Sequence, residues 1–134
     1  MDRFSHKPER PLSPNIQIYR PQLTSVLSIV NRIAGIVLSL GAVILVILLL
    51  AAASGPEAYS YIQVLIHSWP GMILLVGATF AFFLHLCGGI RHLIWDNVRA
   101  FTLGQIYASG WVVVLASAAL TAASLLIGLT TGHH

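Results

Sequence analysis

The chain has 134 residues, of which 57% are apolar and only 8% carry a formal charge. A soluble domain has roughly 25% charged residues, so this composition excludes soluble globular and disordered proteins and indicates an integral membrane protein. The single cysteine, Cys87, excludes a disulfide framework and a cysteine-ligated metal cluster within this chain. The net charge of +3 comes from basic residues clustered in two places, which bears on membrane orientation and not on nucleic-acid binding.

The first twenty residues are polar and proline-rich, and we expect them to lie on the cytoplasmic side of the membrane. Pro8, Pro11 and Pro14 keep this segment extended, because proline breaks helices and biases the preceding residue away from the helical region. The segment has neither the apolar core of a secretory signal nor the pattern of an organelle transit peptide. Pro21 suits the first position of a helix, so the membrane anchor is expected over residues 21–134.

The first membrane-spanning helix is predicted over about residues 23–53. Its uncharged part, residues 33–53, is about 32 Å long at 1.5 Å per residue, which is enough to cross the bilayer core. The sequence Ser54-Gly55-Pro56 ends this helix. Residues 57–67 are less apolar and predict a short helix at the membrane interface.

The second span is predicted over about residues 69–92 and the third over about residues 106–129. Ser68 is a candidate N-cap of the second span, with Trp69 at the level of the lipid headgroups. The predicted fold class is therefore all-α, with three transmembrane helices.

The basic residues predict a single orientation in the membrane. Four of the seven Lys and Arg residues lie in the first twenty positions, and Arg91 and Arg99 flank the connection between the second and third spans. The other connection and the C-terminal tail have none; the His133-His134 pair in that tail is either native or a cloning remnant and receives no role. By the positive-inside rule, the N-terminus is cytoplasmic and the C-terminus periplasmic.

Ionisable residues inside a membrane helix are costly, so they are the first candidates for function. His85, His92 and Asp96 are spaced seven and four residues apart, which puts them on one face of the second span, with Gly88 and Gly89 between them. His85 lies about 24 Å along the helix from Trp69, within the hydrocarbon zone and toward the cytoplasm. A neutral imidazole at this depth can ligate haem iron, and adjacent glycines would let a flat macrocycle approach.

A simpler interpretation of these residues stays open. A lone histidine inside a membrane is often a hydrogen-bonded contact between helices. Arg91, His92 and Asp96 can be anchors at the membrane interface, and Cys87 is expected to be a small packing residue.

Ser28 and Arg32 form a second candidate site, one turn apart where the first span enters the membrane on the cytoplasmic side. A guanidinium can polarise a quinone carbonyl, and a hydroxyl can hydrogen-bond to it and relay a proton. The alternative is a snorkelling arginine beside a serine that bonds its own helix backbone.

Three segments together resemble the cytochrome b subunit of succinate dehydrogenase (complex II). They are RPLSPNIQIY at residues 10–19, SIVNRIAG at residues 28–35, and HLCGGIRHLIWD at residues 85–96. The resemblance extends over essentially the whole chain: its length, its three spans, their orientation and the order of the motifs.

The resemblance implies a role for each matching residue. His85 matches the axial ligand of haem b, whose second ligand comes from a partner anchor subunit, and Arg32 and His92 match residues near the haem propionates. Ser28 and Arg32 match the quinone-site pair. Asp96 matches a position near the quinone end and Arg91 lies in the same motif, and neither has a defined role. Asn31 stands where many members of the family have histidine, which puts propionate neutralisation or proton relay at this position in doubt.

The function that follows is a membrane anchor in a respiratory complex that also takes part in the tricarboxylic acid cycle. The implied partners are a second anchor subunit, an iron–sulfur subunit and a flavoprotein subunit; the cofactor is haem b, and the substrate is ubiquinone or another quinone. The expected location is a bacterial inner membrane, in preference to a mitochondrial one. The chain itself has no flavin motif and no cysteine set for a cluster, so it is not expected to oxidise succinate alone. The alternatives are the anchor of a quinol:fumarate reductase, and a haem-free membrane scaffold or transporter subunit.

Overall fold

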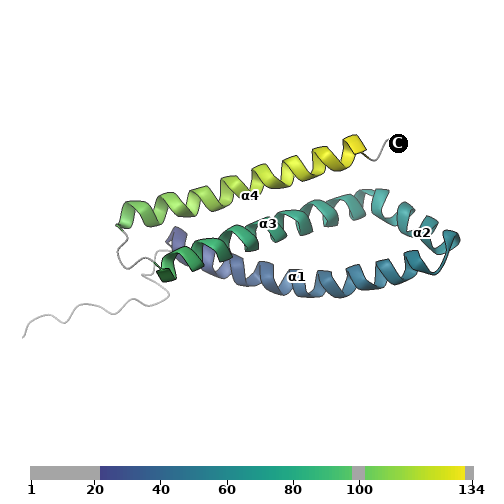
Figure 1. The fold of residues 1–134 in the computed structure, drawn as a ribbon, viewed down its shortest axis with the longest axis horizontal. Helices are drawn as coiled ribbons and strands as arrows, with labels where there is room; N and C mark the ends of the chain where they lie inside the picture. Colours follow the sequence, from purple (N-terminus) through teal and green to yellow (C-terminus); the bar gives the residue numbers. More distant parts are fainter. Residues whose placement is uncertain (1–21, 98–101, 132–134) are drawn as a thin grey trace, which may run out of the picture.

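A computed structural model describes residues 22–97 and 102–131. These residues form four α-helices: α1 (Leu23–Ala53), α2 (Pro56–His67), α3 (Trp69–Asn97) and α4 (Leu103–Thr131). The three long helices run alongside one another, and the short α2 connects α1 to α3 at one end of the molecule (Figure 1). The N-terminal segment, Arg99 and the C-terminal tail fall outside the described residues.

Local sequence accounts for the turn between α1 and α2 and for the corner between α2 and α3. Gly55 has a φ of 139°, a conformation that favours glycine, and Pro56 then occupies the first turn of α2. Ser68 is extended, and its hydroxyl accepts a hydrogen bond of 3.3 Å from the N–H of Gly71, which confirms it as the cap of α3. Gly71 has to be small, because a Cβ there would overlap the backbone carbonyls that end α2.

α3 and α4, the helices that contain the second and third predicted spans, extend beyond those spans. α3 continues to Asn97, so Asp96, beyond the predicted span, lies on the same helix as His85 and His92. α4 begins at Leu103 because Thr102 and Gln105 form a reciprocal capping box. The N–H of Thr102 donates to Gln105 Oε1 at 3.0 Å, and the N–H of Gln105 donates to Thr102 Oγ1 at 3.4 Å.

α3 is the central helix, with α1 and α4 packed against it. α1 also contacts α4 at Gly110, where a Cβ would lie 2.9 Å from the Leu27 side chain and 3.2 Å from that of Leu23. The face of α3 that carries Leu84, Gly88 and Arg91 is buried in this packing. Those positions are separated by four and three residues, the spacing of one helix face.

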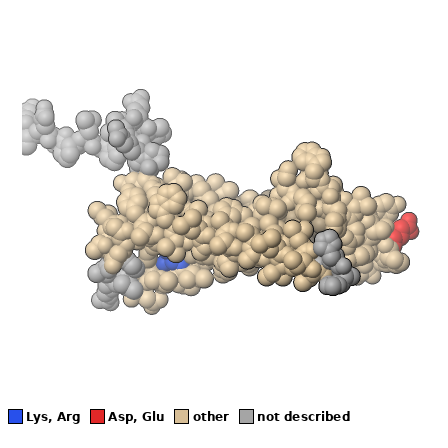
Figure 2. Space-filling model, turned by 90° about the horizontal axis from the view of Figure 1, so that it is seen from above, with Lys and Arg blue, Asp and Glu red and all other residues tan. Residues whose placement is uncertain are grey.

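Most of the apolar surface remains exposed. Among apolar side chains of the described residues, only Ala34, Leu84 and Val113 are buried, whereas Leu40 and Leu50 in α1 are 63% and 65% exposed. Figure 2 shows a face that is almost entirely uncharged, with basic atoms near one end and acidic atoms at the opposite end. α1, α3 and α4 are each long and apolar enough to cross a membrane. The all-α, three-span prediction is confirmed, and lipid or other subunits must cover these surfaces.

Candidate functional site

The His85 ring lies between α3 and α1 and is held by the backbone of α1. Its Nδ1 is 3.0 Å from the carbonyl oxygen of Asn31. A carbonyl can only accept a hydrogen bond, so Nδ1 carries the proton and Nε2 carries the free electron pair. The His85 side chain is exposed on this chain. The arrangement therefore presents one imidazole in a defined tautomer, with a nitrogen able to bind a metal.

Gly35 provides the space that the His85 ring occupies against α1. A Cβ at Gly35 would lie 3.0 Å from Cε1, 3.5 Å from Nδ1 and 3.8 Å from Nε2 of His85. A side chain at this position would push the ring away from α1. Sequence reasoning gave Gly35 no role of its own, although its place one turn after Asn31 is a signal that could have identified it.

The two adjacent glycines of α3 have different surroundings. Gly88 is buried, and the Asn31 carboxamide packs directly on it: the carboxamide carbon lies 3.0 Å from the position of a Gly88 Cβ. Gly89 has nothing within 4 Å of its Cβ position. Gly88 thus lets α1 pack closely on α3, and Gly89 leaves open space on the side of α3 that carries His85.

Arg91 joins α3 to α4. It is only 7% exposed; its Nε donates to Ser109 Oγ at 2.9 Å, and its NH2 group donates to the carbonyl of Ile106 at 3.1 Å. The guanidinium carbon also lies 3.8 Å from the centre of the Trp95 ring. These contacts make Arg91 a link between helices, in place of the interfacial anchor that the sequence suggested.

His92 and Asp96 lie with His85 on the exposed face of α3. The His92 ring meets Trp95 edge to face, with 6.0 Å between ring centres. A small cavity of about 10 Å³ lies between α1, α3 and α4; its lining residues are Leu27, Asn31, Leu84, Gly88, Arg91, His92 and Val113. That volume holds about one water molecule, so this cavity is too small for a haem or a quinone.

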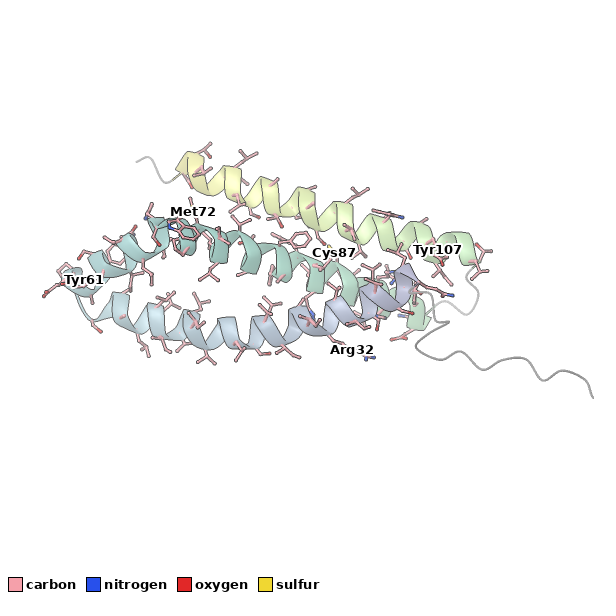
Figure 3. The ribbon with its side chains drawn as sticks, turned by 180° about the vertical axis from the view of Figure 1, so that it is seen from behind. Arg32, Tyr61, Met72, Cys87 and Tyr107 are labelled. Carbon is pink, nitrogen blue, oxygen red and sulfur yellow. The ribbon has the colours of Figure 1, made fainter. Side chains whose placement is uncertain are left out.

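Ser28 and Arg32 are one turn apart on α1, as predicted from their spacing. Ser28 is half-buried and Arg32 is exposed, and Figure 3 shows the Arg32 side chain directed away from α3 and α4. Within residues 22–97 and 102–131, neither Arg32 nor Asp96 forms an ion pair, and no hydrogen bond joins the Ser28–Arg32 pair to His92 or Asp96. In this chain, the structure brings together His85, Asn31, Gly35 and Gly88.

Comparison with known proteins identifies related membrane subunits. Residues 6–124 match the family described as succinate dehydrogenase/fumarate reductase transmembrane subunit. The chain is 35% identical over 118 residues to the succinate dehydrogenase cytochrome b556 subunit of Paracoccus denitrificans, covering 88% of this chain and 91% of that one. It is 38% identical over 113 residues to the corresponding subunit of Rickettsia conorii, covering 84% and 88%. The mitochondrial cytochrome b560 subunit of Dictyostelium discoideum is 38% identical over 119 residues, covering 85% of this chain and 60% of that one.

Proposed function

The chain belongs to the succinate dehydrogenase/fumarate reductase transmembrane subunit family, and on that premise we propose that it is a membrane-anchor subunit of succinate:quinone oxidoreductase that carries half of a haem b site. The observation that carries this proposal is the exposed His85 ring, whose Nδ1–H donates to the Asn31 carbonyl, so that Nε2 is the electron-pair donor. The open space beside Gly89 is compatible with a flat macrocycle. When bound, the haem would supply one-electron redox chemistry.

The second axial ligand would come from a partner anchor subunit. This chain offers one histidine at this depth of the membrane, and a bis-histidine site needs two. The broad exposed apolar surface of the three spans is compatible with a partner helix across the site. Flavin and iron–sulfur chemistry would belong to separate subunits on the cytoplasmic side of a bacterial inner membrane, where the N-terminus of this chain would also lie.

Ser28 and Arg32 would form this chain's part of the quinone site. The exposed guanidinium of Arg32 would donate hydrogen bonds to a quinone carbonyl and stabilise negative charge as it develops. The Ser28 hydroxyl, one turn earlier, would orient the same oxygen and pass it a proton. Arg32 and His92 would also lie near the haem propionates, whereas Asn31 would contribute no charge there.

A reduced-minus-oxidised difference spectrum of the purified complex tests the haem assignment. The parent complex should show a b-type band, and His85→Ala should lose it or bind haem far more weakly. His67→Ala is the matched control, because His67 is also exposed and its Nδ1 also contacts a backbone carbonyl, that of Gln63. A parent complex without the band would instead favour a haem-free scaffold.

Comparing two activities of the same preparation tests the quinone assignment. Arg32→Leu and Ser28→Ala should reduce quinone reduction strongly and leave succinate oxidation by a soluble dye intact. Ser39→Ala is the control for Ser28→Ala, because Ser39 is exposed on the same helix and its hydroxyl donates to the Gly35 carbonyl of its own helix. An equal loss of both activities in Arg32→Leu, or no loss in either, contradicts the assignment.

A further inference from the structure

The contact between α1 and α3 has a feature that helix packing alone does not require. The Asn31 side-chain oxygen is buried and has no hydrogen-bond partner within the described residues. The carboxamide instead lies on the bare Cα of Gly88, and the three atoms nearest to a Cβ at Gly88 all belong to Asn31. Close contacts between a glycine Cα–H and an oxygen recur at helix–helix interfaces and stabilise them weakly. A buried polar atom without a hydrogen-bond partner among the described residues therefore lies where Asn31 of α1 packs on Gly88 of α3.

The same residue contacts His85 through its main chain. The Asn31 carbonyl accepts the hydrogen bond from Nδ1 of His85, at 3.0 Å. The side chain of Asn31 rests on α3 at Gly88, nearly one turn after His85, so one residue of α1 contacts two neighbouring positions of α3. The distance from the carbonyl to the ring then depends on how closely Asn31 can approach Gly88.

We propose that Asn31 is a positioning residue for His85, an inference that rests on the proposed haem ligation. The carboxamide, resting on Gly88, sets the separation of α1 and α3. At that separation the main-chain carbonyl holds the Nδ1 proton, and Gly35 leaves room for the ring. The hydrogen bond increases the basicity of the imidazole, so Nε2 becomes a stronger ligand. Asn31 thus acts through His85, without contact to the iron.

Gly88→Ala in the intact complex tests this proposal, with Gly77→Ala as its control. Both variants add one methyl group to α3, but the Cβ of Gly77 has open space and that of Gly88 meets the Asn31 carboxamide. Gly88→Ala should raise the midpoint potential of haem b, because a weaker donor stabilises ferric iron less. It should also shift the low-spin electron paramagnetic resonance signal and lower haem affinity about 10–100-fold. Gly77→Ala should match the parent.

The double variant Asn31→Ala/Gly88→Ala separates positioning from general disruption. Truncating Asn31 removes the nearest atoms that the new methyl group meets, while the carbonyl of residue 31 remains. The double variant should therefore have the same midpoint potential of haem b as Asn31→Ala alone. The effects of the two substitutions would then be coupled and not additive. If Gly88→Ala fails to assemble, the double variant should restore assembly. A double variant that behaves like Gly88→Ala overturns the role of Asn31.

Gly35→Ala, with Gly41→Ala as control, tests the position of the His85 ring by a second substitution. A Cβ at Gly35 lies 3.0 Å from Cε1 of His85, whereas one at Gly41 meets nothing. Gly35→Ala should shift the potential, and Asn31→Ala should not reverse that shift. A parent complex without haem b refutes the proposed function itself. A parent with haem b in which Gly88→Ala and Gly77→Ala have the same potential refutes only the positioning role.

Discussion

Replacing Arg91 by methionine should weaken the packing of α4 on α3. The change removes two hydrogen bonds, from Nε to Ser109 and from NH2 to the Ile106 carbonyl, and one stacking contact with Trp95. Hydrogen bonds between membrane helices average about 0.6 kcal/mol and reach about 1.7 kcal/mol, and a cation–π contact adds about 0.5–2 kcal/mol. The expected loss is about 2 kcal/mol, or roughly 30-fold in the folding equilibrium.

Methionine leaves no unpaired hydroxyl on Ser109, because the Ser109 hydroxyl also donates to the Ile106 carbonyl at 2.9 Å. The loss should therefore equal the interactions removed, without a further penalty for a buried polar group. Ser109→Ala removes the first of the two hydrogen bonds from Arg91 and takes its partner from Nε of a buried guanidinium, so it should cost more than the roughly 0.6 kcal/mol of the hydrogen bond alone. Arg91→Lys cannot make both bonds with the geometry of a guanidinium, so it should fall between the parent and Arg91→Met.

Reversible unfolding of the purified protein in a detergent titration measures these differences. Arg32→Met is the matched control: Arg32 is exposed and makes no ion pair with any described residue, so its loss should leave the unfolding midpoint almost unchanged. Equal midpoints for Arg91→Met and Arg32→Met would refute the view that Arg91 links the helices. A midpoint for Arg91→Lys identical to the parent would show that charge, and not the forked geometry, is what matters.

Two further substitutions test the corners of the fold. Gly71→Ala should destabilise the protein much more than Gly77→Ala in the same titration. The new methyl group at residue 71 meets backbone carbonyls of α2, which cannot move aside as a side chain can. Equal stability of the two variants would mean that α2 is not held against α3. Gly55→Ala should cost about 1–3 kcal/mol, because alanine rarely adopts a φ of 139°. Gly41→Ala is the control, since Gly41 lies inside α1 with open space around it, and this variant should be neutral or slightly stabilising. A Gly55→Ala variant as stable as Gly41→Ala would contradict the turn assigned to Gly55.

Helix type and helix ends could largely be predicted from local chemistry. Long uncharged runs predicted the three spans, and Ser68 was identified as a cap from its sequence context. The third span predicted from about residue 106 lies within α4, which begins at Leu103 because of the Thr102–Gln105 capping box, whose spacing is visible in the sequence. α3 continues past the predicted second span to Asn97 and includes the face on which His92 and Asp96 were predicted. Charge ends only the apolar zone, since a helix satisfies its own backbone hydrogen bonds in water as well as in lipid.

The residues proposed to carry chemistry can be selected from the sequence: in a chain this poor in charge, periodicity places His85, His92 and Asp96 on one face of α3 and Ser28 with Arg32 on one face of α1. How those residues are held depends on the packing of the helices. The bond from His85 to Asn31 spans 54 positions of the chain, and the different surroundings of Gly88 and Gly89 depend on which side of α3 meets α1. Helical periodicity determines on which side of its own helix each side chain lies. The separation and rotation of two packed helices depend on side chains from both, so no single segment contains that information.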